Sequence, residues 1–279
     1  CLLLMSSLPP PQHKFSKDTN ADLLGFVDDF NGIIIDSKSL PTDKEMFGIV
    51  LQASLEVWKQ EKRKGIWLKI PLPTHAELIT EAIGQGFECH HGESGYVMFT
   101  KWLPETPNTI PAYTSHFVGV GGFVLNDKRE ILVIKEKNGP VTSIWKVPGG
   151  TADPGEDIAE TAVREVLEET GIPCEFECIL GFRQLHTARF GKSDMYFICY
   201  LKPKHCDIKI QESEIADAKW MDLDEFLNLK YYQGVYKKLL ELGKDYADGK
   251  RDGIVAESLP VVFKPGNNTV YYTDNQSRL

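Results

Sequence analysis

The stretch from Gly150 to Ile172 constrains this chain more than any other part of it. It reads GTADPGEDIAETAVREVLEETGI. Asp153-Pro154-Gly155 is a turn sequence, and apolar residues recur after it at helical spacing, from Ile158 to Leu167. Residues 145–148 read as the end of a strand before Gly149, and Gly171 reads as a helix C-terminal cap. The sequence therefore predicts a strand, a glycine loop and a helix.

Three carboxylates share one sector of the predicted helix. At about 100° per residue, Glu165, Glu168 and Glu169 lie side by side. Glu165 and Glu169 repel each other at this spacing, and no lysine follows them at three or four residues to relieve the repulsion. Arg164 precedes Glu168 by four residues and can hold that carboxylate in place. Clustered carboxylate oxygens suit a hard divalent cation such as Mg²⁺, whereas a lone glutamate pair would more simply be a solvated acidic face. The spacing of the whole stretch decides in favour of the metal site.

The spacing of this stretch matches a known motif at every fixed position. The pattern is G-x5-E-x7-R-E-U-x-E-E-x-G-U, where U is aliphatic, and it resembles the Nudix box. The resemblance implies an α/β/α sandwich with a mixed sheet, and hydrolysis of a pyrophosphate bond with Mg²⁺ or Mn²⁺. The matching residues are Gly150, Glu156, Arg164, Glu165, Val166, Glu168, Glu169, Gly171 and Ile172.

The resemblance also suggests roles for the residues of the box. Glu165, Glu168 and Glu169 are the expected metal ligands, and a carbonyl of Gly149 or Gly150 is a further one. Glu156 is expected to support them or to bind a second ion, and Arg164 to orient the carboxylates.

A general base must lie within reach of the attacking water. Some Nudix proteins use a glutamate from a loop outside the box, and Glu212 and Glu214 hold that position here. Both can equally be solvated surface acids, and a box glutamate can do the same work, so the three alternatives stay open.

A second resemblance narrows the family. The connection from Phe190 to Asp194, together with Arg183-Gln184-x-His186, is similar to one Nudix subgroup. That subgroup contains the animal nucleoside-diphosphate-linked moiety X motif six proteins and the plant ADP-ribose/NADH pyrophosphatases. The resemblance covers residues 31–226 and implies ADP-ribose or NADH as the substrate.

Substrate-contacting residues are harder to identify from the sequence. Phe182, Phe190 and Tyr196 are candidates for stacking on an adenine, and Arg183 or Lys192 for meeting a phosphate. Strand packing or loop charge explains each of them equally well.

The first hundred residues resemble a pre-Nudix domain, through the run from Gly65 to Pro71, Gly86-Phe87 with His90-His91, and Trp102-Leu103-Pro104. This implies an acetyltransferase-like α/β fold with a role in homodimerisation or in gating the site. Acetyl transfer is not predicted, because no glycine-containing loop opens a helix for a pyrophosphate. Since adjacent strand residues point to opposite faces, one of His90 and His91 is expected to be packed and the other exposed.

The chain divides into segments by composition and pattern. We expect a disordered amino terminus (residues 1–24), the pre-Nudix domain (25–105), a linker (106–114), the Nudix domain (115–252) and a tail (253–279) that is a late hairpin over 261–263 and 270–272 or disordered. Helices are expected over 43–64, 75–85 and 231–248, and strands over 66–70, 116–125, 178–186 and 193–202.

Acidic residues outnumber basic ones, 40 to 31. This argues against non-specific nucleic-acid binding but allows a small anionic substrate. The six cysteines are scattered and fit reduced thiols in a cytoplasmic protein; a nuclear or mitochondrial location would follow from a targeting segment that has been removed. Residues 1–5 are too short for a signal peptide core, and no apolar run is long enough for a membrane span.

Two rival functions remain at this point. One is a regulator that binds a nucleotide or a protein without hydrolysis, although a binding module has no need for glutamates at repulsive spacing. The other is removal of RNA caps by the same chemistry, which the acidic charge disfavours.

Overall fold

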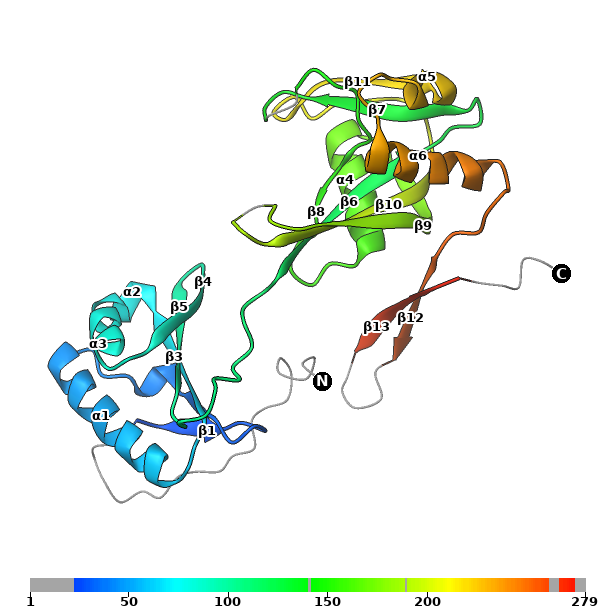
Figure 1. The fold of residues 1–279 in the computed structure, drawn as a ribbon. Coiled ribbons are helices and arrows are strands. Elements are labelled where there is room, and N and C mark those ends of the chain that lie inside the picture. The colour runs from blue at the N-terminus through cyan, green and yellow to red at the C-terminus, as the bar shows by residue number, and fades with distance from the viewer. Residues whose placement is uncertain (1–22, 140–141, 189, 261–265, 274–279) are drawn as a thin grey trace. The chain divides into compact units, whose positions relative to one another are not determined.

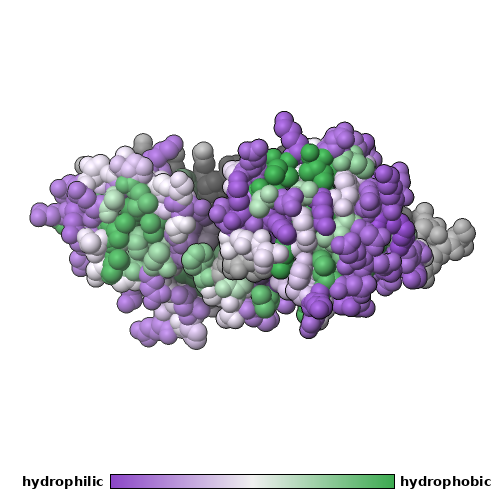
Figure 2. Space-filling model, turned by 90° about the horizontal axis from the view of Figure 1, so that it is seen from above, coloured by the Kyte–Doolittle hydropathy of each residue, from purple (hydrophilic) through white to green (hydrophobic). Residues whose placement is uncertain are grey.

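The computed structural model describes residues 23–139, 142–188, 190–260 and 266–273. It consists of two compact units, Cys1–Tyr113 and Thr114–Leu279 (Figure 1). The segment expected to be disordered, residues 1–24, lies almost wholly outside the described residues. Each unit has its own hydrophobic core, and apolar side chains also reach the surface of both units among polar ones (Figure 2).

The first unit is a mixed five-stranded sheet packed against helices. The strand order is β1-β2-β3-β5-β4, and β2 and β3 are the parallel pair. Phe47, Leu51 and Trp58 of α1 share one core with Ile66 and Leu68 of β3. The elements are β1 (Gly25–Val27), β2 (Ile33–Ile35), η1 (Ser37–Ser39), α1 (Lys44–Gln60), β3 (Gly65–Pro71), α2 (Leu72–His75), η2 (Ala76–Leu78), α3 (Ile79–Gly84), β4 (Glu88–Glu93) and β5 (Tyr96–Trp102).

Both predicted helices of this unit are shorter than the sequence suggested. Helix α1 ends at Gln60 instead of residue 64, because Lys62 takes the left-handed conformation with φ 58°. The helix predicted over residues 75–85 is broken, because His75 has φ −136° and separates α2 from η2 and α3. Strand β1 was not predicted.

The prediction that His90 and His91 point to opposite faces is wrong. A bulge between Cys89 and His91 interrupts the alternation of β4, and the two Nδ1 atoms lie 2.7 Å apart. His90 Nε2 lies 2.8 Å from the carbonyl of Pro111, which can only accept, and His91 Nε2 lies 3.3 Å from the Tyr96 hydroxyl. With Tyr96 donating to His91, His91 to His90 and His90 to Pro111, each of these contacts has one donor and one acceptor.

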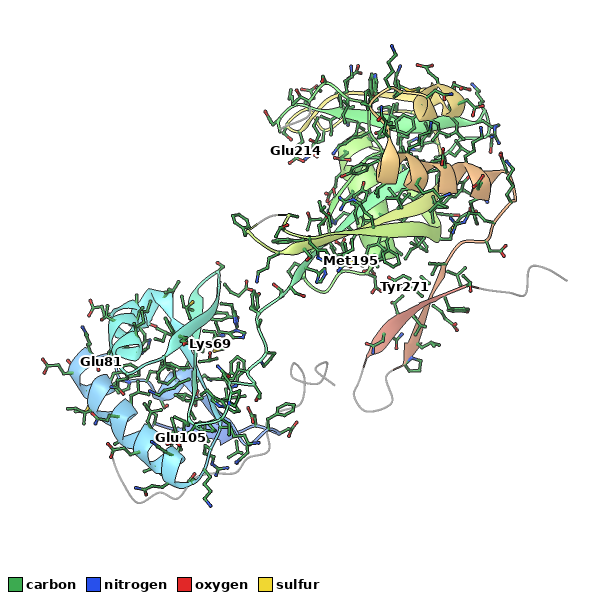
Figure 3. The ribbon with its side chains drawn as sticks, in the orientation of Figure 1. Lys69, Glu81, Glu105, Met195, Glu214 and Tyr271 are labelled. Atoms are coloured by element: carbon green, nitrogen blue, oxygen red, sulfur yellow. The ribbon has the colours of Figure 1, made fainter. Side chains whose placement is uncertain are left out.

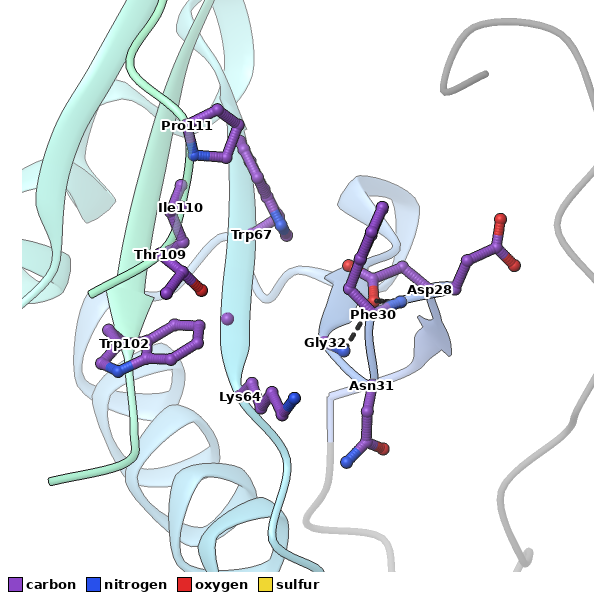
Figure 4. A pocket seen from close by; sticks show the side chains of 12 residues that line it. Asp28, Phe30, Asn31, Gly32, Lys64, Trp67, Trp102, Thr109, Ile110 and Pro111 are labelled. Atoms are coloured by element: carbon purple, nitrogen blue, oxygen red, sulfur yellow. Dashed lines mark hydrogen bonds between the residues drawn. The ribbon is translucent and has the colours of Figure 1, made fainter. Parts of the chain in front are cut away.

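The first unit also contains a cavity of about 500 Å³ (Figure 4). Its walls are mainly apolar and include Trp67, Trp102 and Ile110. The Asp28 carboxylate at the rim accepts hydrogen bonds from the backbone N–H groups of Phe30 and Gly32. The Asp28 carboxylate therefore stabilises the turn that contains it.

The second unit is built on a mixed four-stranded sheet, β8-β6-β10-β9, in which β6 and β10 are parallel. A separate pair, β11-β7, and a hairpin, β12-β13, accompany it. The elements are β6 (His116–Val124), β7 (Glu130–Glu136), β8 (Gly149–Thr151), α4 (Ile158–Thr170), β9 (Cys174–Leu185), β10 (Ser193–Pro203), β11 (Ile215–Asp222), α5 (Leu223–Leu227), α6 (Gly234–Ala247), β12 (Val255–Pro260) and β13 (Asn267–Tyr272).

Alternation along β6 places α4 and α6 on opposite faces of this sheet. Val120 and Val124 share a core with Val166 of α4. Phe123 points to the other face and shares a core with Leu239 of α6. The predicted mixed-sheet α/β/α architecture is confirmed.

The tail forms a hairpin, which is one of its two expected forms. The hairpin pairs β12 with β13. The strand expected over residues 270–272 lies within β13, and the strand expected over residues 261–263 lies outside the described residues. The hairpin contacts the start of α4, where the Ile158 N–H donates to the hydroxyl of Tyr271 (Figure 3). Over the residues that the structure describes, no helix is long and apolar enough to cross a membrane.

Replacing Gly243 should destabilise the second unit. A Cβ at Gly243 would lie 2.5 Å from the ring of Phe123. Overpacking of this kind costs about 1–3 kcal/mol, which exceeds the gain of about 1 kcal/mol in helix propensity. Gly243→Ala should therefore lower the urea unfolding midpoint. Gly84→Ala is the control, because no described atom lies within 4 Å of that Cβ position; equal midpoints for the two variants would contradict the packing argument.

Candidate active site

Helix α4 carries the carboxylates, and local signals define both of its ends. Asp157 is the N-cap and forms a capping box with Glu160. Gly171 ends the helix in the left-handed conformation with φ 70°. Ala162 and Val166 are fully buried against the sheet. The predicted helix is confirmed.

The box glycines form a strand rather than the predicted loop. Gly149 and Gly150 pair with Gly121 and Val120 as part of β8, and the residues before them are not a strand apart from an isolated bridge at Lys146. Gly149 has φ 151°, and a Cβ there would lie 2.2 Å from the Val120 carbonyl oxygen. The backbone approaches β6 too closely for any other residue at this position.

Glu169 is buried where α4 meets β8. Its residue is only 6% exposed, and its Oε2 accepts a hydrogen bond of 2.8 Å from the Gly149 N–H. Burial raises the pKa of Glu169 to about 7, although the Gly149 bond and the nearby Lys146 oppose the shift. The helix is therefore joined to the glycine strand through a carboxyl that is costly to ionise.

Arg164 joins the other glutamates of the box. It binds Glu156 through two hydrogen bonds, of 2.7 Å from Nε and 2.9 Å from Nη2. Its Nη1 donates to Glu165 at 2.9 Å and to Glu168 at 3.1 Å. The Arg164 guanidinium holds the pKa of Glu156 at about 2, whereas burial raises the pKa of Glu165. Arg164 therefore links three carboxylates of the box, and its orienting role remains a prediction.

The carboxylates do not form a ready-made metal cage. Among the described residues, no group of three or more His, Cys, Asp or Glu side chains is placed to hold a metal ion. Even so, the donors suit a hard cation: the Glu165 carboxylate lies against Gly150, where a Cβ would be 2.4 Å from Oε1. Burial raises the pKa values of Glu165 and Glu169, and a divalent cation would favour the ionised form of both carboxyl groups.

A cavity of about 730 Å³ lies beside the glycine strand. Its wall combines the backbone of β8 with basic, acidic and aromatic side chains from β7, β9, β10 and α6. Lys146 in the wall is paired with Glu136. The lining residues are Phe117, Gly119, Glu136, Ile144, Lys146, Val147, Gly149, Gly150, Thr151, Arg183, Ala188, Asp194, Tyr196, Ile198, Tyr231, Tyr232, Tyr236, Leu239 and Leu240.

Only part of the predicted substrate set lines this cavity. Arg183 and Tyr196 are opposite each other on β9 and β10 and share the cavity face. Phe182 points to the other face because residues alternate along a strand, and its ring packs on Phe197 at 5.1 Å. Phe190 is 93% exposed, and neither it nor Lys192 is part of the lining.

Sequence reasoning missed the tyrosines that precede and open α6. Tyr231 and Tyr232 both hold the segment before the box: the Trp145 N–H donates to the Tyr231 hydroxyl at 2.8 Å, and the Tyr232 hydroxyl donates to the Trp145 carbonyl at 2.7 Å. Tyr236 completes this wall. The Tyr231-Tyr232 pair is recognisable in the sequence as a candidate for substrate stacking. Its contact with Trp145 is not, because the two segments are far apart in sequence.

The two candidate bases outside the box lie in an exposed turn before β11. Glu214 is at the end of the β7-β11 pair (Figure 3). The Gln211 N–H donates to the Glu169 carbonyl at 3.2 Å, so the turn that carries Glu212 begins at the carboxyl end of α4. Neither glutamate lines the cavity, and the side chains of both are exposed.

Carboxylate oxygens beside a cavity lined by charged and aromatic residues suit a metal-assisted hydrolase for a small charged substrate. Comparisons with known proteins agree with this class. A Nudix hydrolase domain model matches residues 23–103 and a NUDIX domain model matches residues 115–242. The chain belongs to the Nudix hydrolase family, and it is a pyrophosphohydrolase.

Several relatives match most of the chain. Nudix hydrolase 2 of Arabidopsis thaliana is 40% identical over 251 residues, which cover 89% of this chain and 89% of that protein. Nucleoside diphosphate-linked moiety X motif 6 of Homo sapiens is 39% identical and covers 87% and 79%, respectively. Among solved structures, the MutT protein from Methanosarcina mazei Go1 is 22% identical with a TM-score of 0.42, over 50% of this chain and 100% of that one.

Glu169 should make the metal-free protein less stable as the pH rises. Its folded pKa of about 7 exceeds the ordinary 4.5, so stability present below pH 4.5 is lost as the pH rises to about 7. The loss is on the order of 3 kcal/mol. Glu169→Gln should remove this loss while keeping the bond to Gly149.

The measurement is the urea unfolding midpoint of both proteins in EDTA at pH 5 and pH 8. The wild type should lose more stability than the variant between these values, and Mg²⁺ at pH 8 should restore stability to the wild type. The same pH dependence in both proteins would contradict the assignment of the buried charge to Glu169.

Proposed function

We propose that this chain hydrolyses the pyrophosphate bond of ADP-ribose or NADH with Mg²⁺ or Mn²⁺. Family membership supports hydrolysis of a nucleoside diphosphate linked to another moiety. The observation that carries the narrower proposal is the cavity beside β8. Its volume of about 730 Å³ lies within the range of about 300–1,000 Å³ typical of small-molecule sites.

The composition of the cavity wall suits a dinucleotide. Tyr196, Tyr231, Tyr232 and Tyr236 offer aromatic surface on which an adenine can stack. Arg183 and Lys146 lie in the same wall, each paired with an acidic residue of that wall, Asp194 and Glu136 respectively. Their remaining N–H donors suit phosphate oxygens. The strand Gly149–Thr151 brings the box to this cavity, so the scissile bond would lie beside the glutamates of α4.

Glu165, Glu168 and Glu169, with a carbonyl of Gly149 or Gly150, are the residues that would hold the cation. A bound divalent cation supplies charge neutralisation for phosphate oxygens and lowers the pKa of a bound water. Glu168 has the most exposed of the three carboxylates, with a side chain 52% exposed. It is therefore the most accessible to an incoming ion.

The other residues of the box have orienting tasks. Arg164 fixes the positions of Glu165 and Glu168 through Nη1, and Glu156 anchors Arg164 from the other side. Glu156 is itself held by the hydroxyl of Thr161 and the N–H of Asp153. Loss of Glu156 would therefore release Arg164 from one of its partners and loosen the carboxylates.

The attacking water also needs a proton acceptor. Glu212 and Glu214 lie in the turn that adjoins the end of α4, and a glutamate of the box is the alternative. Lys137 restrains this turn, because its N–H donates to the Glu214 carbonyl at 2.7 Å and its Nζ donates to the Glu212 carbonyl. Glu212→Gln and Glu214→Gln would separate these alternatives through their effects on kcat.

Hydrolysis should require the box carboxylates. With Mg²⁺, the wild type should release AMP from ADP-ribose or NADH, and Glu168→Gln should lower kcat/KM at least about a hundredfold because a ligand of the cation is lost. The substrate panel should also contain coenzyme A, dinucleoside polyphosphates and capped RNA, with products separated by chromatography.

Glu160→Gln is the matched control for this assay. Glu160 lies on the same helix, and a glutamine at this position preserves the capping box. This variant should keep the wild-type rate. If the wild type prefers capped RNA, coenzyme A or dinucleoside polyphosphates over ADP-ribose and NADH, the proposed substrates are wrong.

A further inference from the structure

Arg183 has unused hydrogen-bond donors at the cavity wall. Its side chain is 13% exposed, and it forms an ion pair with Asp194, in which Nη2 lies 3.0 Å from Oδ2. Nε and Nη1 are buried and have no hydrogen-bond partner among the described residues. Because a buried donor without an acceptor is unfavourable, this guanidinium is prepared for an acceptor that the described part of the chain does not provide.

Two tyrosine rings lie against the guanidinium. Its Cζ is 5.2 Å from the ring centre of Tyr196 and 5.3 Å from that of Tyr236, both within cation–π distance. The glycines of β6 make room for Tyr196, since a Cβ at Gly121 would lie 2.3 Å from its hydroxyl oxygen and a Cβ at Gly119 would lie 3.0 Å from its ring. Tyr196 therefore packs directly against the backbone of β6 at these two glycines.

Tyr236 is the more exposed of the two rings. It belongs to the first turn of α6 and is 49% exposed. The free nitrogens of Arg183 are closed to solvent, so a ligand reaches them when a covering group moves. Among the two rings, Tyr236 is the one with room to do so.

The sheet places Arg183 across the cavity from the box. Thr151, Gly119, Tyr196 and Arg183 occupy paired positions on β8, β6, β10 and β9. Three strand spacings separate the first from the last, which is roughly 14 Å between backbones, and the long arginine side chain shortens that gap. One extended nucleotide can therefore reach both ends of the row.

We propose that Arg183 binds a phosphoryl oxygen of the nucleotide substrate directly, as a second anion-binding point of the site that does not depend on the metal. The inference rests on the proposed function for its ligand class. A guanidinium presents N–H donors in a fixed plane, which matches phosphoryl oxygens better than an ammonium does. Asp194 and Tyr196 hold that plane in position.

A purely structural role is the alternative, in which Arg183 only ties β9 to β10 and α6. The two roles predict different effects of Arg183 on the binding of AMP and of adenosine. A phosphate-binding arginine distinguishes AMP from adenosine, whereas a packing arginine affects both ligands alike because it shapes the cavity.

Calorimetric titration of the full chain in EDTA tests this directly, because no cation is then available to hold the phosphate. The wild type should bind AMP more tightly than adenosine. Arg183→Gln should weaken AMP binding at least about tenfold and change adenosine binding less than about twofold. Arg183→Lys, which keeps the charge, should give an intermediate loss of AMP affinity and serves if the glutamine variant does not fold.

Lys202→Gln is the matched control. Lys202 and Glu177 form an ion pair across the same two strands, and the Lys202 side chain is 64% exposed. This variant removes one positive charge and one β9-β10 ion pair without touching the cavity, so it should keep the affinities for AMP and adenosine.

Two results would overturn the proposal: equal losses of AMP and adenosine affinity in Arg183→Gln, or no preference for AMP in the wild type. A different result would count against the proposed substrates alone. If the AMP preference depends on Arg183 but neither ADP-ribose nor NADH yields AMP with Mg²⁺, the anion-binding role stands and the substrate assignment fails.

Discussion

The hydrogen bond from the Gly149 N–H to the buried Glu169 carboxylate is the contact on which the site depends. It fixes the C-terminal half of α4 to β8 at 2.8 Å, and the glycine strand in turn forms one wall of the cavity. The bond compensates only part of the cost of burying a carboxylate, because the pKa of Glu169 remains raised to about 7. The fold thus keeps a carboxyl group where burial makes its ionisation unfavourable, and a cation would offset that cost.

Side chains on one face of the sheet pack against α4, and those on the other face lie toward the cavity. One face of β6 packs Val120 and Val124 against α4, and the other directs Gly119 and Gly121 toward Tyr196 and the cavity. Strand β8 contributes to both regions, since Gly150 meets Glu165 of the box and Thr151 lines the cavity. The carboxylates and the aromatic wall come from opposite faces but meet at this one edge strand.

The parts that the sequence predicted well depend on local interactions. The capping box at Asp157, the apolar stripe and Gly171 define α4 without help from distant residues, and Arg164 reaches Glu168 within one turn of the same helix. Parts that depend on distant contacts were predicted less well. The tyrosines that approach Trp145 are more than eighty residues away from it in sequence, and the bulge that joins His90 and His91 has no local signature.

The glycines of β6 show how one sequence pattern can serve different purposes. Gly119-x-Gly121-Gly122 has the composition of a phosphate-binding turn, yet it continues as a strand and no helix follows it. Each glycine instead leaves room for a side chain from a neighbouring element: Gly119 and Gly121 for Tyr196, and Gly122 for Val166 of α4, where a Cβ would lie 2.5 Å from a methyl group. Larger residues at these positions would push α4 from one face and Tyr196 from the other. The three glycines of β6 therefore determine how closely α4 and Tyr196 approach the two faces of this strand.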